Sequence, residues 1–126
     1  MPVELAELLP PSPLSPAPPR RQRRSPSERL RMALQVLAGY QGQITAHRQQ
    51  AWASITFSGA RHTLILQFHG AGSIPAGETF IAALPDHEFS IPGQIVAEAT
   101  IQAVDHQLLP ESRMLVTVEL LLLEDQ

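Results

Sequence analysis

The chain contains no cysteine and no lysine, and only 5% of its 126 residues are aromatic. Without cysteine, disulfide bonds, thiolate nucleophiles and cysteine-ligated zinc or iron–sulfur sites are excluded, so apolar packing has to stabilise the fold. Without lysine, a P-loop for nucleotide phosphates is excluded as well. No apolar run approaches the roughly 18 residues of a membrane span. Prolines also interrupt the N-terminal apolar residues, so these form no run as long as that of a signal peptide. We therefore expect a cytoplasmic protein that makes no membrane contact.

Proline is concentrated at the N-terminus, where residues 1–26 hold eight of the twelve prolines. Such a segment cannot bury enough apolar surface to offset the entropy of ordering it. We predict that residues 1–26 form a disordered tail and that residues 27–126 form one small domain, since about 100 residues suffice for a single core. Within the tail, Val3, Leu5, Leu8 and Leu9 have the spacing of a brief amphipathic turn, which is either a docking peptide or a frayed end.

Arginine supplies all nine basic residues, and they are distributed unevenly. Residues 32–126 contain three arginines and nine acidic residues, whereas the other six arginines are Arg20, Arg21, Arg23, Arg24, Arg29 and Arg31. A flexible arm of this kind can neutralise phosphates without reading bases, so nucleic-acid binding is one candidate function. The remaining chain is acidic and lacks the clustered aromatic residues of an RNA-binding sheet, which favours a solvated linker or an arm that docks on an acidic protein.

The first helix signal begins at Ser25, which can cap a helix whose first residue is Pro26 and whose capping box is completed by Glu28. Apolar residues then follow with helical spacing, and Gly39 or Gly42 can end the helix. The apolar positions are Leu30, Leu34, Leu37 and Ala38. We expect one face of this helix to pack on a sheet.

After Gly42 the apolar period changes from helical spacing to two, which predicts strands. The alternation over residues 51–57, a turn at Ser58–Gly59 and a second strand over residues 61–68 predict a hairpin. A short helix starts near Pro75 and stops before Pro85. A second hairpin follows, with strands over residues 95–104 and 114–123; Ile95, Ala97, Ala99, Ile101 and Ala103 share one face of its first strand.

The order of these elements predicts an α+β fold: a four-stranded antiparallel sheet built from two hairpins, with the N-terminal helix packed on it and a short helix between the hairpins. The last strand is apolar on both faces at Leu120, Leu121, Leu122 and Leu123. Such a strand is either covered twice or lies at a subunit contact, so these four leucines are the predicted surface for a protein partner or for a homodimer.

Catalytic and metal-binding patterns are sparse. The five histidines are His47, His62, His69, His87 and His106. His62 and His69 are an odd number of residues apart on one predicted strand, so they point to opposite faces, and we predict neither a metal site nor a cofactor. Asp86, His87 and Glu88 form the densest polar cluster, in which flanking carboxylates would tune the histidine for acid–base chemistry, although no nucleophile is specified nearby.

These observations favour a non-enzymatic interaction or accessory module that associates with a protein partner or with itself through its last strand. The first alternative is a nucleic-acid-associated protein that uses the arginine-rich arm. The second alternative is a small enzyme with a loop centred on His87.

Overall fold

The structure, a computed structural model, describes residues 24–125. Its elements in chain order are α2 (Pro26–Leu37), β1 (Gln43–Ala53), β2 (Ser58–His69), α3 (Ile74–Ala83), the 3₁₀ turn η2 (Leu84–Asp86), β3 (Gln94–Gln107) and β4 (Arg113–Glu124). The predicted disordered tail lies outside the described residues as far as residue 23. None of the helices in the described range is long and apolar enough to cross a membrane.

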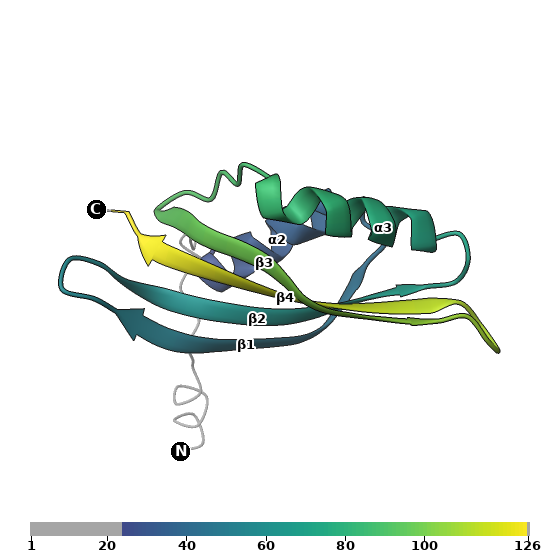
Figure 1. The fold of residues 1–126 in the computed structure, drawn as a ribbon. Coiled ribbons are helices and arrows are strands. Elements are labelled where there is room, and N and C mark those ends of the chain that lie inside the picture. The colour runs from purple at the N-terminus through teal and green to yellow at the C-terminus, as the bar shows by residue number, and fades with distance from the viewer. Residues whose placement is uncertain (1–23, 126) are drawn as a thin grey trace, which may run out of the picture.

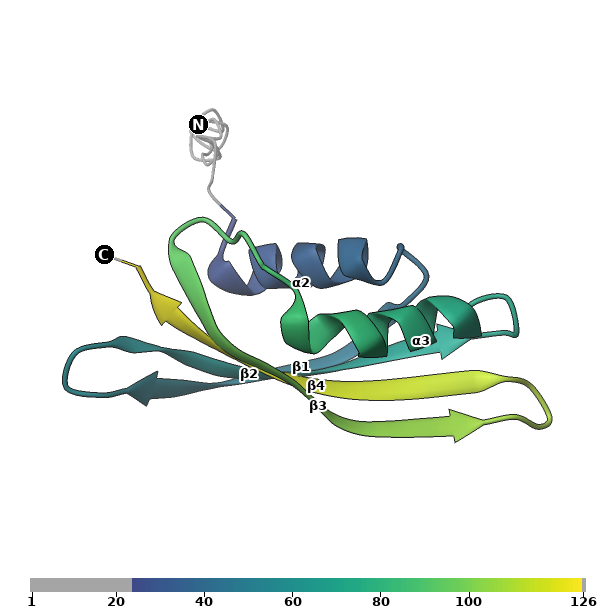
Figure 2. The same ribbon diagram turned by 45° about the horizontal axis from the view of Figure 1, so that its top comes forward.

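The four strands form one antiparallel sheet in the order β1-β2-β4-β3. Both helices lie on the same face of this sheet (Figure 1, Figure 2), which gives a two-layer structure. Each helix precedes one hairpin, and the two helix–hairpin units meet where β2 pairs with β4. The predicted α+β architecture is therefore confirmed.

The caps of α2 follow from its sequence. Ser25 Oγ accepts a hydrogen bond from the Glu28 backbone N–H at 3.1 Å, and Glu28 Oε1 accepts one from the Ser25 N–H at 3.0 Å, which completes the predicted capping box. At the other end Gly39 has φ +66°, and the N–H of Tyr40 donates to the Gln35 carbonyl at 2.8 Å. This is the Schellman arrangement, so Gly39, one of the two predicted stops, ends the helix.

The predicted turn of the first hairpin is wrong. The turn lies at Ser54–Phe57, where the Ser54 N–H donates to the Phe57 carbonyl at 2.7 Å, and Ser58–Gly59 belongs to β2. The prediction was wrong because Ile55 continues the apolar alternation although it lies in the turn, where its side chain is fully exposed. Gly59 is not a turn residue but allows β2 to lie close to β4. A Cβ there would overlap the Leu122 carbonyl oxygen and lie 2.8 Å from Leu123 Cα.

The unbroken alternation predicted for residues 95–104 is also wrong. The register of β3 against β4 shifts between Val96 and Glu98 and again between Ile101 and Ala103. As a result Ile101 faces the helices with its partner Val118, whereas Ala103 lies on the opposite face. β-Bulges of this kind locally disrupt the ladder of an edge strand, which discourages pairing with other chains.

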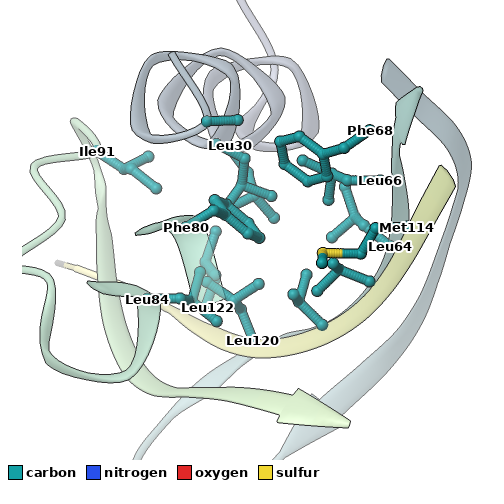
Figure 3. Packing of buried hydrophobic residues seen from close by; sticks show 14 residues of the cluster. Leu30, Leu64, Leu66, Phe68, Phe80, Leu84, Ile91, Met114, Leu120 and Leu122 are labelled. Carbon is teal, nitrogen blue, oxygen red and sulfur yellow. The ribbon is translucent and has the colours of Figure 1, made fainter. Parts of the chain in front are cut away.

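The core fills the space between the helices and the inner face of β2 and β4 (Figure 3). Phe68 of β2 and Phe80 of α3 meet there with ring centroids 5.8 Å apart. Alternate residues of the two central strands supply most of the remaining side chains, as the period-two pattern predicts. The fully buried strand residues include Leu64, Leu66, Val116, Val118, Leu120 and Leu122.

Candidate functional site

The four leucines predicted as an interaction surface are covered within the chain. Leu120 and Leu122 face the helices and have no exposed surface, while Leu121 and Leu123 on the opposite face are only 4% and 8% exposed. A partner that approached this strand would therefore contact the side chains around the leucines more than the leucines themselves. Association with a partner or a second copy through residues 120–123 stays a prediction.

An ion pair accounts for the burial of Leu121. In the sheet register Leu121 lies between Arg61 of β2 and Glu98 of β3. Arg61 Nη1 donates to Glu98 Oε1 at 3.1 Å and lies 3.8 Å from Glu119 Oε1. The Arg61–Glu98 pair thus crosses β4 above Leu121 on the face that the helices leave uncovered.

The arginine-rich arm is only partly described. Arg20, Arg21 and Arg23 lie outside the described residues. Arg24 Nη1 donates to Met32 Sδ at 2.8 Å, Arg29 Nη1 donates to the Pro92 carbonyl at 2.8 Å, and Arg31 Nη1 lies 2.8 Å from His47 Nδ1. All three arginines of the arm that the structure describes therefore contact the domain itself, and nucleic-acid binding through the arm stays a prediction.

His87 lies on the surface after η2. Its ring makes an edge-on contact with Phe89, with centroids 4.6 Å apart, and both flanking carboxylates are exposed. Its side chain makes no hydrogen bond to another residue in the range 24–125, so no group there orients the imidazole for acid–base chemistry. The enzyme alternative centred on His87 also stays a prediction.

The structure brings together two histidines that the sequence did not pair. His47 of β1 and His62 of β2 both face the helices, and His47 Nε2 lies 2.9 Å from His62 Nδ1. On its other side, His47 Nδ1 lies 2.8 Å from Arg31 Nη1 of α2. His62 is 2% exposed and is the one buried polar side chain among the described residues.

The guanidinium of Arg31 sets the direction of hydrogen bonding in this chain of groups. Arginine can only donate, so His47 Nδ1 accepts and the proton of His47 resides on Nε2. That N–H donates to His62 Nδ1, which places the proton of neutral His62 on Nε2. The result is a chain of donors running from Arg31 through His47 to His62, which we call the histidine relay.

The surroundings keep both imidazoles neutral. Burial, and then the positive charge of Arg31, lower the pKa of His47 below its usual range. Burial, and then His47 and Arg31, lower the pKa of His62 to about 4. Protonation of either ring would turn an accepting nitrogen into a donor and break one hydrogen bond of the relay. At neutral pH the relay therefore presents the His62 Nε2–H and offers no basic lone pair at that position.

His62 lines a cavity of about 400 Å³ where the start of α2 meets the ends of the strands. The other lining residues come from all four strands and from the first turn of α2 and its cap: Ser25, Pro26, Ser27, Gln49, Gly59, Ala60, Gln94 and Glu124. Ser27 Oγ donates to Gln49 Oε1 at 2.6 Å, and Glu124 Oε1 accepts from Ser58 Oγ at 3.2 Å. Among residues 24–125 there is no cluster of three or more histidine, aspartate or glutamate side chains that would hold a metal ion.

Comparison with known proteins adds no relative, since no family model, no curated protein and no solved structure matches this chain.

The outer face of α2 is the second notable surface. Met32 and Val36 lie one turn apart on the outer face of α2, and Tyr40 follows after the helix has ended; the three side chains are 48%, 58% and 75% exposed. We call these three residues the α2 ridge. The three side chains adjoin the same pair of grooves, since Met32 lines both, Val36 lines one and Tyr40 lines the other. A group of large exposed apolar side chains of this kind marks a surface for contact.

Two grooves run beside the α2 ridge. One, of about 610 Å³, lies between α2 and residues 90–92, and Arg29 closes its wall through the hydrogen bond to Pro92. The other, of about 540 Å³, lies between α2 and the start of β1, with Arg31 and Tyr40 in its lining. Arg24 and Met32 border both grooves. The ridge is therefore an apolar strip with guanidinium groups on both sides.

Proposed function

We propose that this protein is a non-enzymatic interaction module that binds an acidic amphipathic segment along the α2 ridge. The observation that carries the proposal is the group of Met32, Val36 and Tyr40, each about half exposed or more, between two grooves bordered by arginines. An amphipathic segment recognised in this way lays its apolar residues against the ridge and its carboxylates against the guanidinium groups.

Charge favours an acidic occupant. Arg24, Arg29 and Arg31 line the two grooves, and Glu28 is the one acidic residue that residues 24–125 contribute to either lining. Glu28 is itself engaged in the capping box of α2. The net positive charge beside the ridge therefore attracts carboxylates and repels a basic segment.

The N-terminus of the chain has the required chemistry. Residues 3–9 combine Val3, Leu5, Leu8 and Leu9 with Glu4 and Glu7 and contain no basic residue. A peptide of residues 1–9 is therefore a suitable probe of the α2 ridge. The pairing also offers a route to self-association that does not use Leu120 to Leu123.

The experiment measures fluorescence anisotropy of the labelled 1–9 peptide titrated with the full chain carrying Leu5→Asp and Leu8→Asp, which disables the chain's own copy of the segment. We expect saturable binding that Val36→Glu weakens at least tenfold, because a carboxylate would enter the apolar contact and repel Glu4 and Glu7. Added salt should weaken binding moderately, since exposed charges are screened.

Val104→Glu is the matched control, because Val104 is 44% exposed but lies on β3, away from the ridge. It should leave peptide affinity unchanged. Binding that responds equally to Val36→Glu and Val104→Glu, or no saturable binding, would contradict the proposal. Labelled single-stranded RNA and duplex DNA in the same assay test the nucleic-acid alternative.

A further inference from the structure

A buried donor in the domain lacks an acceptor. His62 is 2% exposed, its Nδ1 accepts from His47, and its Nε2 has no hydrogen-bond partner among residues 24–125. Buried polar groups are nearly always paired, so an unpaired ring N–H in a protein interior points to a molecule that completes it.

His62 contributes to the wall of the cavity at the start of α2, and His47 does not. Nδ1 and Nε2 flank Cε1 and point in widely divergent directions, so when Nδ1 points to His47 the Nε2–H is directed away from it. The relay thus holds a directed donor at the wall of a cavity of about 400 Å³, a size at which proteins bind small molecules.

The lining decides which ligand chemistry fits. The Arg31–His47–His62 order fixes Nε2 as a donor, so the ligand must offer an acceptor. Glu124 contributes a carboxylate to the cavity, and no arginine belongs to the described part of its lining. An anionic acceptor would therefore be repelled by the Glu124 carboxylate inside the cavity. The nearest described positive charge, Arg31, lies behind His47 and is already hydrogen-bonded to it, so a neutral acceptor fits this lining better.

We infer that this cavity is a binding site for a small neutral amide, whose carbonyl oxygen accepts from His62 Nε2–H. The site is separate from the α2 ridge and does not depend on the proposed function. Its specificity comes from the relay, because His47 and Arg31 hold the His62 ring in the donor tautomer that a carbonyl requires.

The test compares three probes of one size: benzamide, which is neutral and offers a carbonyl, benzoate, which is anionic, and benzamidinium, which offers donors only. Long-range ¹H–¹⁵N correlation spectra of the full chain report the ring nitrogens of each histidine. Benzamide should shift the His62 Nε2 resonance saturably, and the same concentrations of benzoate and benzamidinium should shift it at least tenfold less. The ring signals of exposed His106 serve as an internal control.

Glu124→Gln removes the negative charge that excludes anions but keeps the His62 donor. It should not alter the core, because Glu124 is exposed at the end of β4. This variant should bind benzoate at least threefold better than the unaltered chain does, while still binding benzamide. Absence of a saturable benzamide shift at His62, or equal binding of benzamide and benzoate by the unaltered chain, would overturn the inference.

Discussion

His47 Nε2 and His62 Nδ1 lie 2.9 Å apart although the two residues are not directly opposite in the sheet. His47 pairs with Leu64 and His62 pairs with Gln49, so the imidazoles meet diagonally across β1 and β2. Long side chains reach such diagonal neighbours on one face of an antiparallel pair. The contact therefore depends on the hairpin register, and Arg31 of α2 then gives it a direction.

Removing either imidazole should reveal this coupling. His47→Leu leaves the buried Nδ1 of His62 without a donor, and we expect a loss of about 1–3 kcal/mol of unfolding free energy. His62→Leu leaves His47 without its acceptor, but this should lower the unfolding free energy by less, because His47 is only partly buried and its N–H can reach water.

The double variant His47→Leu/His62→Leu should be more stable than the sum of the two single effects implies, by about 1 kcal/mol. The measurement is urea unfolding of all four proteins. Additivity within about 0.3 kcal/mol would show that the two rings do not interact energetically.

The histidine relay predicts a loss of stability in mild acid. The folded-state pKa of His62 is about 4, below the ordinary value of 6.5, so the unfolded chain binds this proton more readily than the folded chain does. The contribution of His62 is therefore complete above pH 6.5 and is lost as the pH falls toward 4. The groups that face His62 are His47 from β1, Arg31 from α2 and, across the cavity, Glu124 from β4.

The loss from His62 should amount to about 3 kcal/mol between pH 7 and pH 4, measured by urea unfolding at each pH. The double variant His47→Leu/His62→Leu should show a much flatter profile over this range. His106→Gln, at an exposed position, should follow the unaltered protein. A double variant as acid-sensitive as the unaltered chain would assign the loss to carboxylates instead.

Local features of this fold were predictable from the sequence, and features that depend on register were not. The capping box at Ser25 and Glu28 and the helix stop at Gly39 involve residues close together in the chain, so their spacing alone specifies them. The first hairpin depended on where the turn lies. With the strand placed at residues 51–57, His47 fell outside it and its contact with His62 could not be foreseen.

If Ser54–Phe57 had been recognised as the turn, the contact between His47 and His62 could have been predicted, because a hairpin centred there brings His47 opposite residues 62–64. The Arg61–Glu98 pair across Leu121 could not be predicted even with the correct hairpin. It requires β2, β4 and β3 to be neighbours in that order, and this arrangement comes from long-range packing. The sequence therefore indicated an unusual apolar strand end without showing that the chain covers it.

Gly59 should be intolerant of a side chain. A Cβ at this position would overlap backbone atoms of Leu122, which cannot move without separating β2 from β4. We expect Gly59→Ala to lower the unfolding free energy by about 3 kcal/mol, at the upper end of ordinary overpacking. Thermal and urea unfolding measure the change.

Gly72→Ala is the matched control for Gly59→Ala, because no atom lies within 4 Å of a Cβ built there and its φ is not positive. It should change stability by no more than about 0.5 kcal/mol. Equal effects of the two substitutions would indicate that β2 and β4 can separate at Gly59 without cost.

Leu121 should behave as a core residue even though no helix covers its face of the sheet. It is 4% exposed beneath the Arg61–Glu98 pair, whereas Ile95 on the same face is 41% exposed. We expect Leu121→Ala to cost about 2–3 kcal/mol of unfolding free energy and Ile95→Ala to cost less than about 1 kcal/mol. If both cost less than about 1 kcal/mol while sedimentation shows a dimer that Leu121→Ala dissociates, the leucines of β4 form a subunit contact. A large loss for Leu121→Ala in a monomer would instead assign the apolar end of β4 to the chain's own packing.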